Sequence, residues 1–133
     1  MVEPAGHYEL AIEREGWLFV AGQTGEDVTG RLGDLEAQTR QAITNVEDII
    51  RTFRGRLEDV VRMTCFLRDI EDFPVFDAAY RSRLGTVRPV RTTVGSTGLP
   101  AGELVEIEAT AYVGGALRDA DTLDSYHDQE ERP

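Results

Sequence analysis

The most informative absence in this 133-residue sequence is lysine, because all 14 basic residues are arginine. Without lysine the chain cannot form a Schiff base to a carbonyl substrate or to pyridoxal phosphate. It also lacks the lysine of a phosphate-binding P-loop, and neither a GxxxxGKS/T nor a GxGxxG pattern occurs. Lysine-based and P-loop chemistry is therefore excluded for this chain, and no cofactor is predicted.

Cysteine and histidine are nearly as scarce. The single cysteine, Cys65, allows no internal disulfide, which is typical of a reducing compartment and predicts a cytoplasmic protein. It lies among alternating apolar residues with no histidine placed to activate it, so we interpret it as a core residue rather than a nucleophile. The two histidines, His7 and His127, have no partner at a metal-ligand spacing, and no metal site is predicted.

Positive charge and long apolar runs are lacking too. The formal net charge is -11 at pH 7, which disfavours nucleic acid and anionic lipid as partners. No apolar run approaches the roughly 20 residues that span a bilayer, and the N-terminus shows no basic-then-apolar leader. With 41% hydrophobic residues, the chain can bury the core of one domain, expected over residues 1–115. Residues 116–133, which hold six acids and two arginines, are expected to form a flexible tail.

The apolar periodicity predicts the element order β-β-α-β-α-β-β. Strands are expected over residues 8–13, 17–21, 58–68, 91–95 and 104–113, and helices over 34–54 and 72–84. Asp34 and Asp72 can cap the helices, while Gly55 and Gly85 can end them in a left-handed conformation. The residues expected to face the core include Tyr8, Leu10 and Ile12 in the first strand and Val61, Met63, Cys65 and Leu67 in the third. The result is an α+β fold, with two helices packed on one face of a mixed sheet.

The last strand indicates which face of that sheet is buried. Its odd-numbered residues from Val105 to Val113 are apolar, whereas its even-numbered residues include Glu106, Glu108 and Tyr112. Because two helices cover only one face, the second face is amphipathic. We expect it to meet another subunit, and a half-exposed sheet in a monomer is the alternative.

Charged residues near these last two strands could carry chemistry. Arg91 shares a strand face with Thr93 and could clamp a substrate carboxylate, or it could be a solvated or salt-bridged arginine. Glu106 could activate a water as a general base, with Glu108 about 7 Å further along the strand, or both could be solvated surface residues. Asp77 interrupts the apolar stripe of the second helix and is either a satisfied buried acid or a site residue.

Tyr8 could line a pocket or fill the core or an interface, and His7 is a weak general-acid candidate in a loop.

Several segments in the same order resemble one known family, the reactive intermediate/imine deaminase family, also called RidA/YjgF/YER057c/UK114. The matching segments, which lie between about residue 5 and residue 113, are Gly6-His7-Tyr8, Ala21-Gly22-Gln23, Gln38-Thr39 with Asn45, Val60–Thr64, Phe73 to Tyr80, Pro89-Val90-Arg91 and Leu99-Pro100 with Val105–Ala109. No single segment is specific, but their order and spacing are.

The resemblance implies a chorismate-mutase-like fold, a homotrimer with sites between subunits, and hydrolysis of 2-imino acids to 2-keto acids and ammonia. It implies that Arg91 binds the substrate carboxylate, that Glu106 activates water, and that Tyr8, Gly22, Asp77 and Thr93 line the substrate site. No cofactor is implied.

Departures from the family pattern place the chain in a divergent subgroup. His7 replaces a proline, Ala21 a serine, Asp77 an asparagine and Thr93 a cysteine. The alternative function is therefore a sensor or binding protein for small carboxylates or keto acids that has lost the chemistry. A ribonuclease activity, sometimes attached to the family, is disfavoured by the charge of -11.

Overall fold

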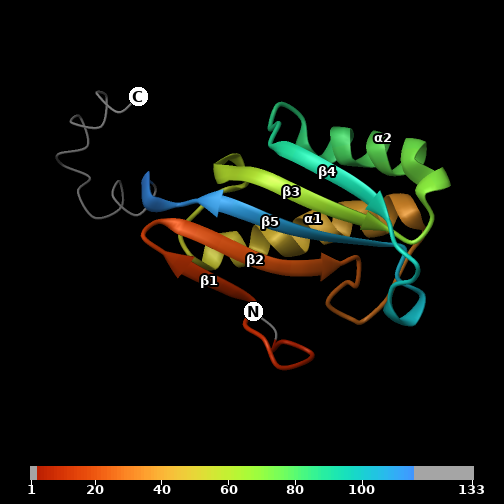
Figure 1. Cartoon of the computed structure of the whole chain (residues 1–133), viewed down its shortest axis with the longest axis horizontal. Helices are drawn as coiled ribbons and strands as arrows, with labels where there is room; N and C mark the ends of the chain where they lie inside the picture. Colours follow the sequence, from red (N-terminus) through yellow and green to blue (C-terminus); the bar gives the residue numbers. More distant parts are fainter. Residues whose placement is uncertain (1–2, 116–133) are drawn as a thin grey trace.

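The computed structural model describes residues 3–115 and places them in two layers, one sheet and one pair of helices (Figure 1). The elements are β1 (Ala11–Arg14), β2 (Trp17–Thr24), α1 (Leu35–Thr52), β3 (Val60–Leu67), α2 (Phe73–Leu84), β4 (Val90–Gly95) and β5 (Val105–Tyr112). The sheet order is β1-β2-β5-β3-β4, with β3 and β4 parallel and all other neighbours antiparallel. This confirms the predicted α+β fold. The predicted flexible tail, 116–133, lies outside the described residues.

Helix α1 begins as predicted but ends differently. The carboxylate of Asp34 accepts a hydrogen bond from the backbone N–H of Ala37 at 2.9 Å, so Asp34 is the N-cap. The prediction that Gly55 supplies the left-handed residue is wrong, because Arg54 has the positive φ of 67°. Glycine is needed at position 55 for space instead, since a Cβ there would lie 2.5 Å from Cγ1 of Val113.

Strand β1 is shorter than predicted and exposes part of the expected core face. It begins at Ala11, so Tyr8 precedes it, and Leu10 alone among the three expected core residues is buried. Ile12 pairs with Phe19 on the face away from the helices, and both are exposed. The alternation fails here because Leu10 lies before the strand, where the two-residue period does not apply.

Strand β3 contains a bulge that the sequence pattern did not reveal. Its pairing with β5 shifts between Val60 and Arg62, so Val61 has no direct partner in the ladder. Val60 is buried in its place, and Val61, predicted to face the core, is 40% exposed. A bulge inserts one extra residue and therefore reverses the alternation on one side of it. From Met63 to Leu67 the predicted alternation is confirmed.

Helix α2 is preceded by a single 3-10 turn, Ile70–Asp72, which changes how its start is capped. Asp72 holds the N-cap position, but its side chain makes no capping hydrogen bond. Instead, the carboxylate of Asp69 accepts from the backbone N–H of Glu71 at 3.0 Å, one turn earlier. The end of the helix is as predicted, with Gly85 at a φ of 63°.

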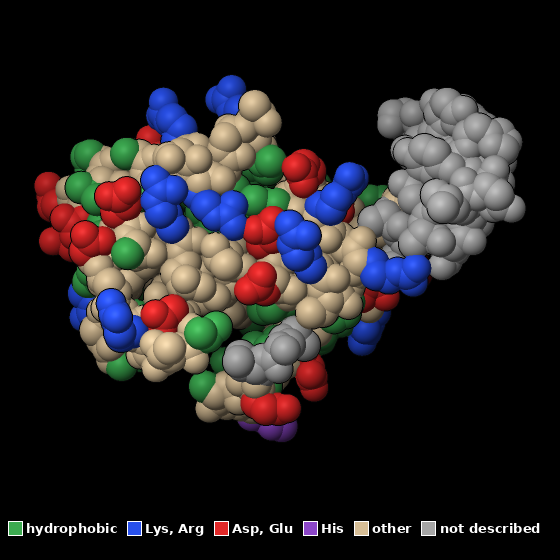
Figure 2. Space-filling view, turned by 180° about the vertical axis from the view of Figure 1, so that it is seen from behind, with side chains coloured by type: hydrophobic (Ala, Val, Ile, Leu, Met, Phe, Trp, Pro, Cys, Tyr) green, Lys and Arg blue, Asp and Glu red, His purple; other side chains and the backbone are tan. Residues whose placement is uncertain are grey.

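The two helices of the second layer are also joined by charge. Figure 2, seen from the side opposite to Figure 1, shows acidic and basic side chains interspersed over the helical surface. Glu47 of α1 accepts hydrogen bonds from Arg51 of the same helix at 2.9 Å and from Arg83 of α2 at 2.5 Å. Burial alone would raise the pKa of Glu47, but these two arginines outweigh burial and hold it below its usual range. The pair Glu47–Arg83 therefore ties α2 to α1.

Candidate functional site

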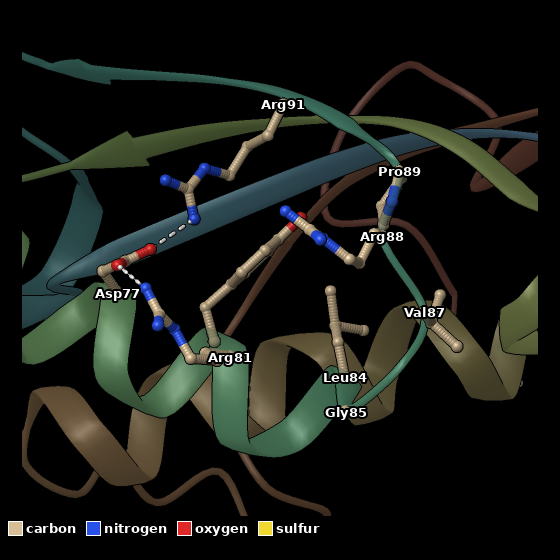
Figure 3. A pocket seen from close by; sticks show the side chains of 9 residues that line it. Asp77, Arg81, Leu84, Gly85, Val87, Arg88, Pro89 and Arg91 are labelled. Carbon is tan, nitrogen blue, oxygen red and sulfur yellow. Dashed lines mark hydrogen bonds and ion pairs between the residues drawn. The ribbon is translucent and has the colours of Figure 1, made fainter.

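A pocket of about 580 Å³ opens between the second half of α2 and the start of β4 (Figure 3). Its lining consists of Asp77, Tyr80, Arg81, Leu84, Gly85, Val87, Arg88, Pro89 and Arg91. The turn after α2 makes this arrangement possible, because the chain leaves the helix at Gly85 and rises to the sheet at Pro89 (Figure 3). The pocket thus combines an apolar floor with three guanidinium groups.

Arg91 is held firmly on the helix side of the sheet. It lies opposite Met63 in the β3–β4 ladder, and Nη1 donates to Oδ1 of Asp77 at 2.8 Å. Its side chain is only 23% exposed. The carbon Cζ stands over the rings of Tyr80 at 4.7 Å, Phe73 at 5.4 Å and Phe76 at 5.5 Å from their centroids. Stacking on aromatic faces and one ion pair orient the guanidinium and leave part of it facing the pocket.

Asp77 resolves the choice that the sequence left open, because it is both satisfied and part of the pocket. Its Oδ1 accepts from Arg91, and its Oδ2 accepts from Arg81 at 3.1 Å. The hydrogen bond from Arg91 is the main cause that lowers the pKa of Asp77, against a smaller opposing effect of burial. Asp77 is therefore ionised at neutral pH and cannot serve as a proton donor there.

Asp77→Asn is expected to destabilise the protein at neutral pH and to matter less in acid. Because the pKa of Asp77 is lowered from 3.8 on folding, its contribution is fully present above that value. The contribution is lost as the pH falls through the lower, folded-state pKa. Urea unfolding of both proteins, at about pH 7 and about pH 3, measures the difference in free energy of unfolding. An equal difference at both pH values would show that this ion pair is not the cause.

Thr93 lies two residues along β4 on the same face as Arg91. Its hydroxyl oxygen is buried and has no hydrogen-bond partner among the described residues. A buried hydroxyl left without a partner costs roughly 1–3 kcal/mol, so this group is available to a ligand.

Cys65, the ladder neighbour of Thr93, is buried, and burial raises the pKa of its thiol to about 12. That thiol stays protonated near neutral pH, in agreement with its interpretation as a core residue.

Glu106 lies on the other face of the sheet. It pairs with Thr24 of β2 and Phe66 of β3, and its carboxylate lies directly against Gly22. A Cβ at position 22 would collide with Oε2 of Glu106, so glycine leaves the space that this carboxylate occupies. Glu108 is more exposed, and it lines a shallower hollow of about 290 Å³ together with Phe19, Arg62 and Thr64, among others.

Arg91 and Glu106 therefore do not meet within one chain. The ladder places Arg91 and Thr93 beside Met63 and Cys65, which face the helices. It places Glu106 beside Phe66, whose side chain points the opposite way. Because successive strand residues alternate between faces, the sheet itself separates the guanidinium from the carboxylate.

Tyr8 is not part of the arginine pocket either. It lies ahead of β1, is 48% exposed, and its hydroxyl accepts from the backbone N–H of Ala5 at 3.3 Å. His7 beside it is exposed as well. The candidate residues thus fall into two groups, one around Arg91 and one on the opposite face around Glu106, with Tyr8 outside both.

The sequence analysis did not predict three charged residues that lie near the candidate sites. Arg81 and Arg88 both line the pocket of Arg91. Arg81 carried a signal, because it stands four residues after Asp77 on one helix, a spacing at which side chains pair. No sequence pattern indicated that Arg88 lines the pocket, because the direction of its side chain depends on the turn at Gly85.

Glu103 is the third, and it lies close to Glu106 just before β5. Its Oε1 is buried without a hydrogen-bond partner among residues 3–115. Burial raises the pKa of Glu103, and the negative charges of Glu106 and Glu26 raise it further, against a hydrogen bond with Thr24. No local pattern could reveal it, because a 3-10 turn, Pro100–Gly102, directs the chain there.

Across residues 3–115, no three histidine, cysteine, aspartate or glutamate side chains gather closely enough to hold a metal ion. Within the same range, no helix has both the length and the apolar character needed to cross a membrane.

Fold and pocket together define a small two-layer α+β protein with an arginine-lined pocket at one edge of its sheet. Residues 1–113 match the family model described as Endoribonuclease L-PSP, and the chain belongs to this family, the YjgF/RidA family. The crystal structure of RidA from the Antarctic bacterium Psychrobacter sp. PAMC 21119 has the same fold. It aligns with a TM-score of 0.78 at 32% identity, covering 83% of this chain and 91% of that one.

Two relatives in the family carry different names. A RutC family protein of Pyrococcus horikoshii is 38% identical over 113 residues, which are 83% of this chain and 90% of that protein. The 2-iminobutanoate/2-iminopropanoate deaminase of Dermatophagoides farinae is 32% identical over 117 residues, 84% of this chain and 89% of that protein. The predicted family and fold are confirmed.

Proposed function

We propose that this protein hydrolyses reactive 2-imino acids, such as those that form from 2-aminoacrylate, to 2-keto acids and ammonia. The observation that carries the proposal is the guanidinium of Arg91, which is stacked on three rings and partly turned into a pocket. A planar cation fixed in this way matches a planar carboxylate and can donate a hydrogen bond to each of its two oxygens. A relative named 2-iminobutanoate/2-iminopropanoate deaminase supports the same reaction.

The reaction asks little of the protein, because an imine carbon is already electrophilic. Arg91 binds the substrate carboxylate and so orients the C=N carbon, with the free hydroxyl of Thr93 beside it. Glu106 accepts a proton from water while the water oxygen bonds to that carbon, forming a carbinolamine. The imine nitrogen takes up the proton that Glu106 accepted, and the hydroxyl proton then passes to the same nitrogen. The C–N bond breaks as the keto group forms, the nitrogen leaves as ammonia, and Glu106 is again a carboxylate.

Glu106 of one chain and Arg91 of another form this site in our proposal, within a homotrimer. The separation of the two residues by the sheet supports such an arrangement, since a single chain holds only half of the machinery. The face around Glu106 also carries exposed aromatic side chains, with Trp17 at 43% and Phe19 at 50% exposure. Large apolar side chains on one sheet face are typical of a surface that another subunit covers.

The experiment that tests the function generates imines in place. An amino-acid oxidase converts a neutral amino acid to its 2-imino acid, and semicarbazide traps whatever imine has not yet been hydrolysed. Addition of this protein is expected to lower the yield of trapped imine and to speed the release of ammonia. An unchanged yield over a wide range of protein concentration would exclude the deaminase.

A binding function without turnover is the second candidate, and the Asp77–Arg91 pair favours it. At 2.8 Å the carboxylate of Asp77 already occupies part of the guanidinium that a substrate would need. Calorimetry with 2-oxobutanoate separates the two candidates when it is combined with the imine assay. Tight binding with no effect on imine lifetime would favour the sensor, and faster loss of imine would favour the enzyme.

Gly22→Ala is expected to lower imine turnover by at least about tenfold while leaving the fold intact, because the new methyl group would push the Glu106 carboxylate aside. Only the end of a flexible side chain must move, so the cost in stability should be small. Gly98→Ala is the matched control, since no atom lies within 4 Å of a Cβ at that position. Wild-type turnover in Gly22→Ala would remove Glu106 from the reaction or show that it has other room.

A further inference from the structure

The pocket of Arg91 is unusual for this protein because it gathers positive charge. Three arginines, Arg81, Arg88 and Arg91, line it together with one carboxylate, Asp77, although the whole chain carries a net charge of -11. Figure 3 shows the side chains of all three arginines directed to the same space. A local excess of positive charge on an acidic protein favours an anionic ligand there.

Asp77 does not neutralise this excess. Each of its oxygens is bonded to a different guanidinium, Oδ1 to Arg91 and Oδ2 to Arg81. Arg88 forms no ion pair with any residue in the range 3–115. One carboxylate is therefore shared by two cations while a third has none, so the pocket can take two negative charges from a ligand.

The remaining surface of the pocket suits a short carbon chain. Leu84, Val87, Pro89 and Tyr80 line the pocket together with the arginines. The volume of about 580 Å³ also exceeds what a three- or four-carbon imino acid needs, because pockets of this size hold considerably larger ligands. Room, apolar walls and Arg88, a cation with no ion pair among residues 3–115, all indicate a longer substrate with a second charged group.

We propose that the preferred substrate is a dicarboxylic 2-imino acid, whose second carboxylate is bound by Arg88. Arg91 holds the carboxylate next to the imine carbon, and the methylene groups pack on the apolar walls. Arg81 stands at the rim, tied to Asp77, and adds its charge to the same field. A carboxylate is the fitting anion because Asp77, itself a carboxylate, already bridges two of these guanidinium groups. This inference rests on the proposed deaminase function for its reaction, but not for its binding site.

The test compares two imines of equal length, 2-iminoglutarate and 2-iminopentanoate, each made in place by an oxidase. Wild-type protein is expected to show a kcat/KM at least about tenfold higher for the dicarboxylic imine, as one charge-assisted contact permits. In Arg88→Gln the ratio of the two kcat/KM values should fall close to one. Arg31→Gln, a change of an exposed arginine that does not line this pocket, should keep the wild-type ratio.

Failure of this inference is distinguishable from failure of the deaminase proposal. If 2-iminopentanoate is hydrolysed but the wild-type ratio is one or less, the dicarboxylate assignment is wrong and the enzyme stands. If neither imine is hydrolysed, calorimetry with glutarate and pentanoate decides. Tighter binding of glutarate that is lost in Arg88→Gln would support the pocket as a dicarboxylate site. Equal affinities, or tighter binding of inorganic phosphate than of glutarate, would overturn it.

Discussion

Arg91→Ala is expected to reduce kcat/KM for 2-imino acids by a factor of about a thousand, or roughly 4 kcal/mol of transition-state binding. The change removes the cation that holds the substrate carboxylate and leaves an oxidase-generated imine to its spontaneous decay. Arg91 is mostly buried against three aromatic rings, which fix the position of its guanidinium in the pocket. The trapped-imine assay measures the loss directly.

Folding must be separated from chemistry in this variant. Loss of Arg91 leaves Asp77 bonded to Arg81, so α2 keeps this ion pair. Arg91→Lys is the informative control, because it keeps the positive charge but loses the planar fork, and it should retain an intermediate rate. Thermal unfolding of all three proteins shows whether they are folded at the assay temperature. A well-folded Arg91→Ala with more than about a tenth of wild-type kcat/KM would remove Arg91 from substrate binding.

Two inactive variants are expected to restore activity in each other. Arg91→Ala and Glu106→Gln should each be nearly inactive, because each destroys one half of every site. When equal amounts are unfolded and refolded together, about a quarter of the sites in a closed ring receive an intact Arg91 from one chain and an intact Glu106 from its neighbour. The imine assay on the mixture should therefore give about a quarter of the wild-type rate.

A second mixture tests the same geometry from the opposite direction. The double variant, refolded with an equal amount of wild-type chain, should also yield about a quarter of the wild-type rate if sites lie between chains. It should yield about half if each chain holds a whole site. No recovery in the first mixture together with half in the second would place Arg91 and Glu106 in one chain, against the register of the sheet. Each variant refolded alone gives the background.

The local sequence pattern correctly predicted those parts of the fold in which the burial of a residue depends only on its neighbours in the same helix or strand. The three- and four-residue spacing of apolar side chains along α1, with Asp34 as its cap, is a property of one helix and was confirmed. The strict alternation from Val105 to Ala111 in β5 was confirmed for the same reason, and with it the outward direction of Glu106. These patterns are legible because burial on one face of an element repeats at the period of its backbone.

Local pattern failed where a residue's position depends on a partner strand. The two-residue alternation around Val61 was broken by a bulge against β5, which leaves no mark in the sequence of β3 itself. In β4 the two valines, Val90 and Val94, are both exposed, while Arg91 faces the helices. A prediction from hydrophobicity alone would have placed the two valines toward the helices and Arg91 on the opposite face. Such an error assigns every side chain of the strand to the wrong face of the sheet.

By itself the sequence determined the family and the α+β fold, and it identified Arg91 and Glu106 as candidate site residues. Each of these conclusions rests on the spacing of residues along one chain. The tertiary structure decided what surrounds them. It joined Asp77 to both Arg91 and Arg81, brought Arg88 into the same pocket through the turn at Gly85, and placed Arg91 on the face of the sheet opposite to Glu106. The physical reason is register: pairing between strands, and not the order of residues within one, sets which side chains share a face.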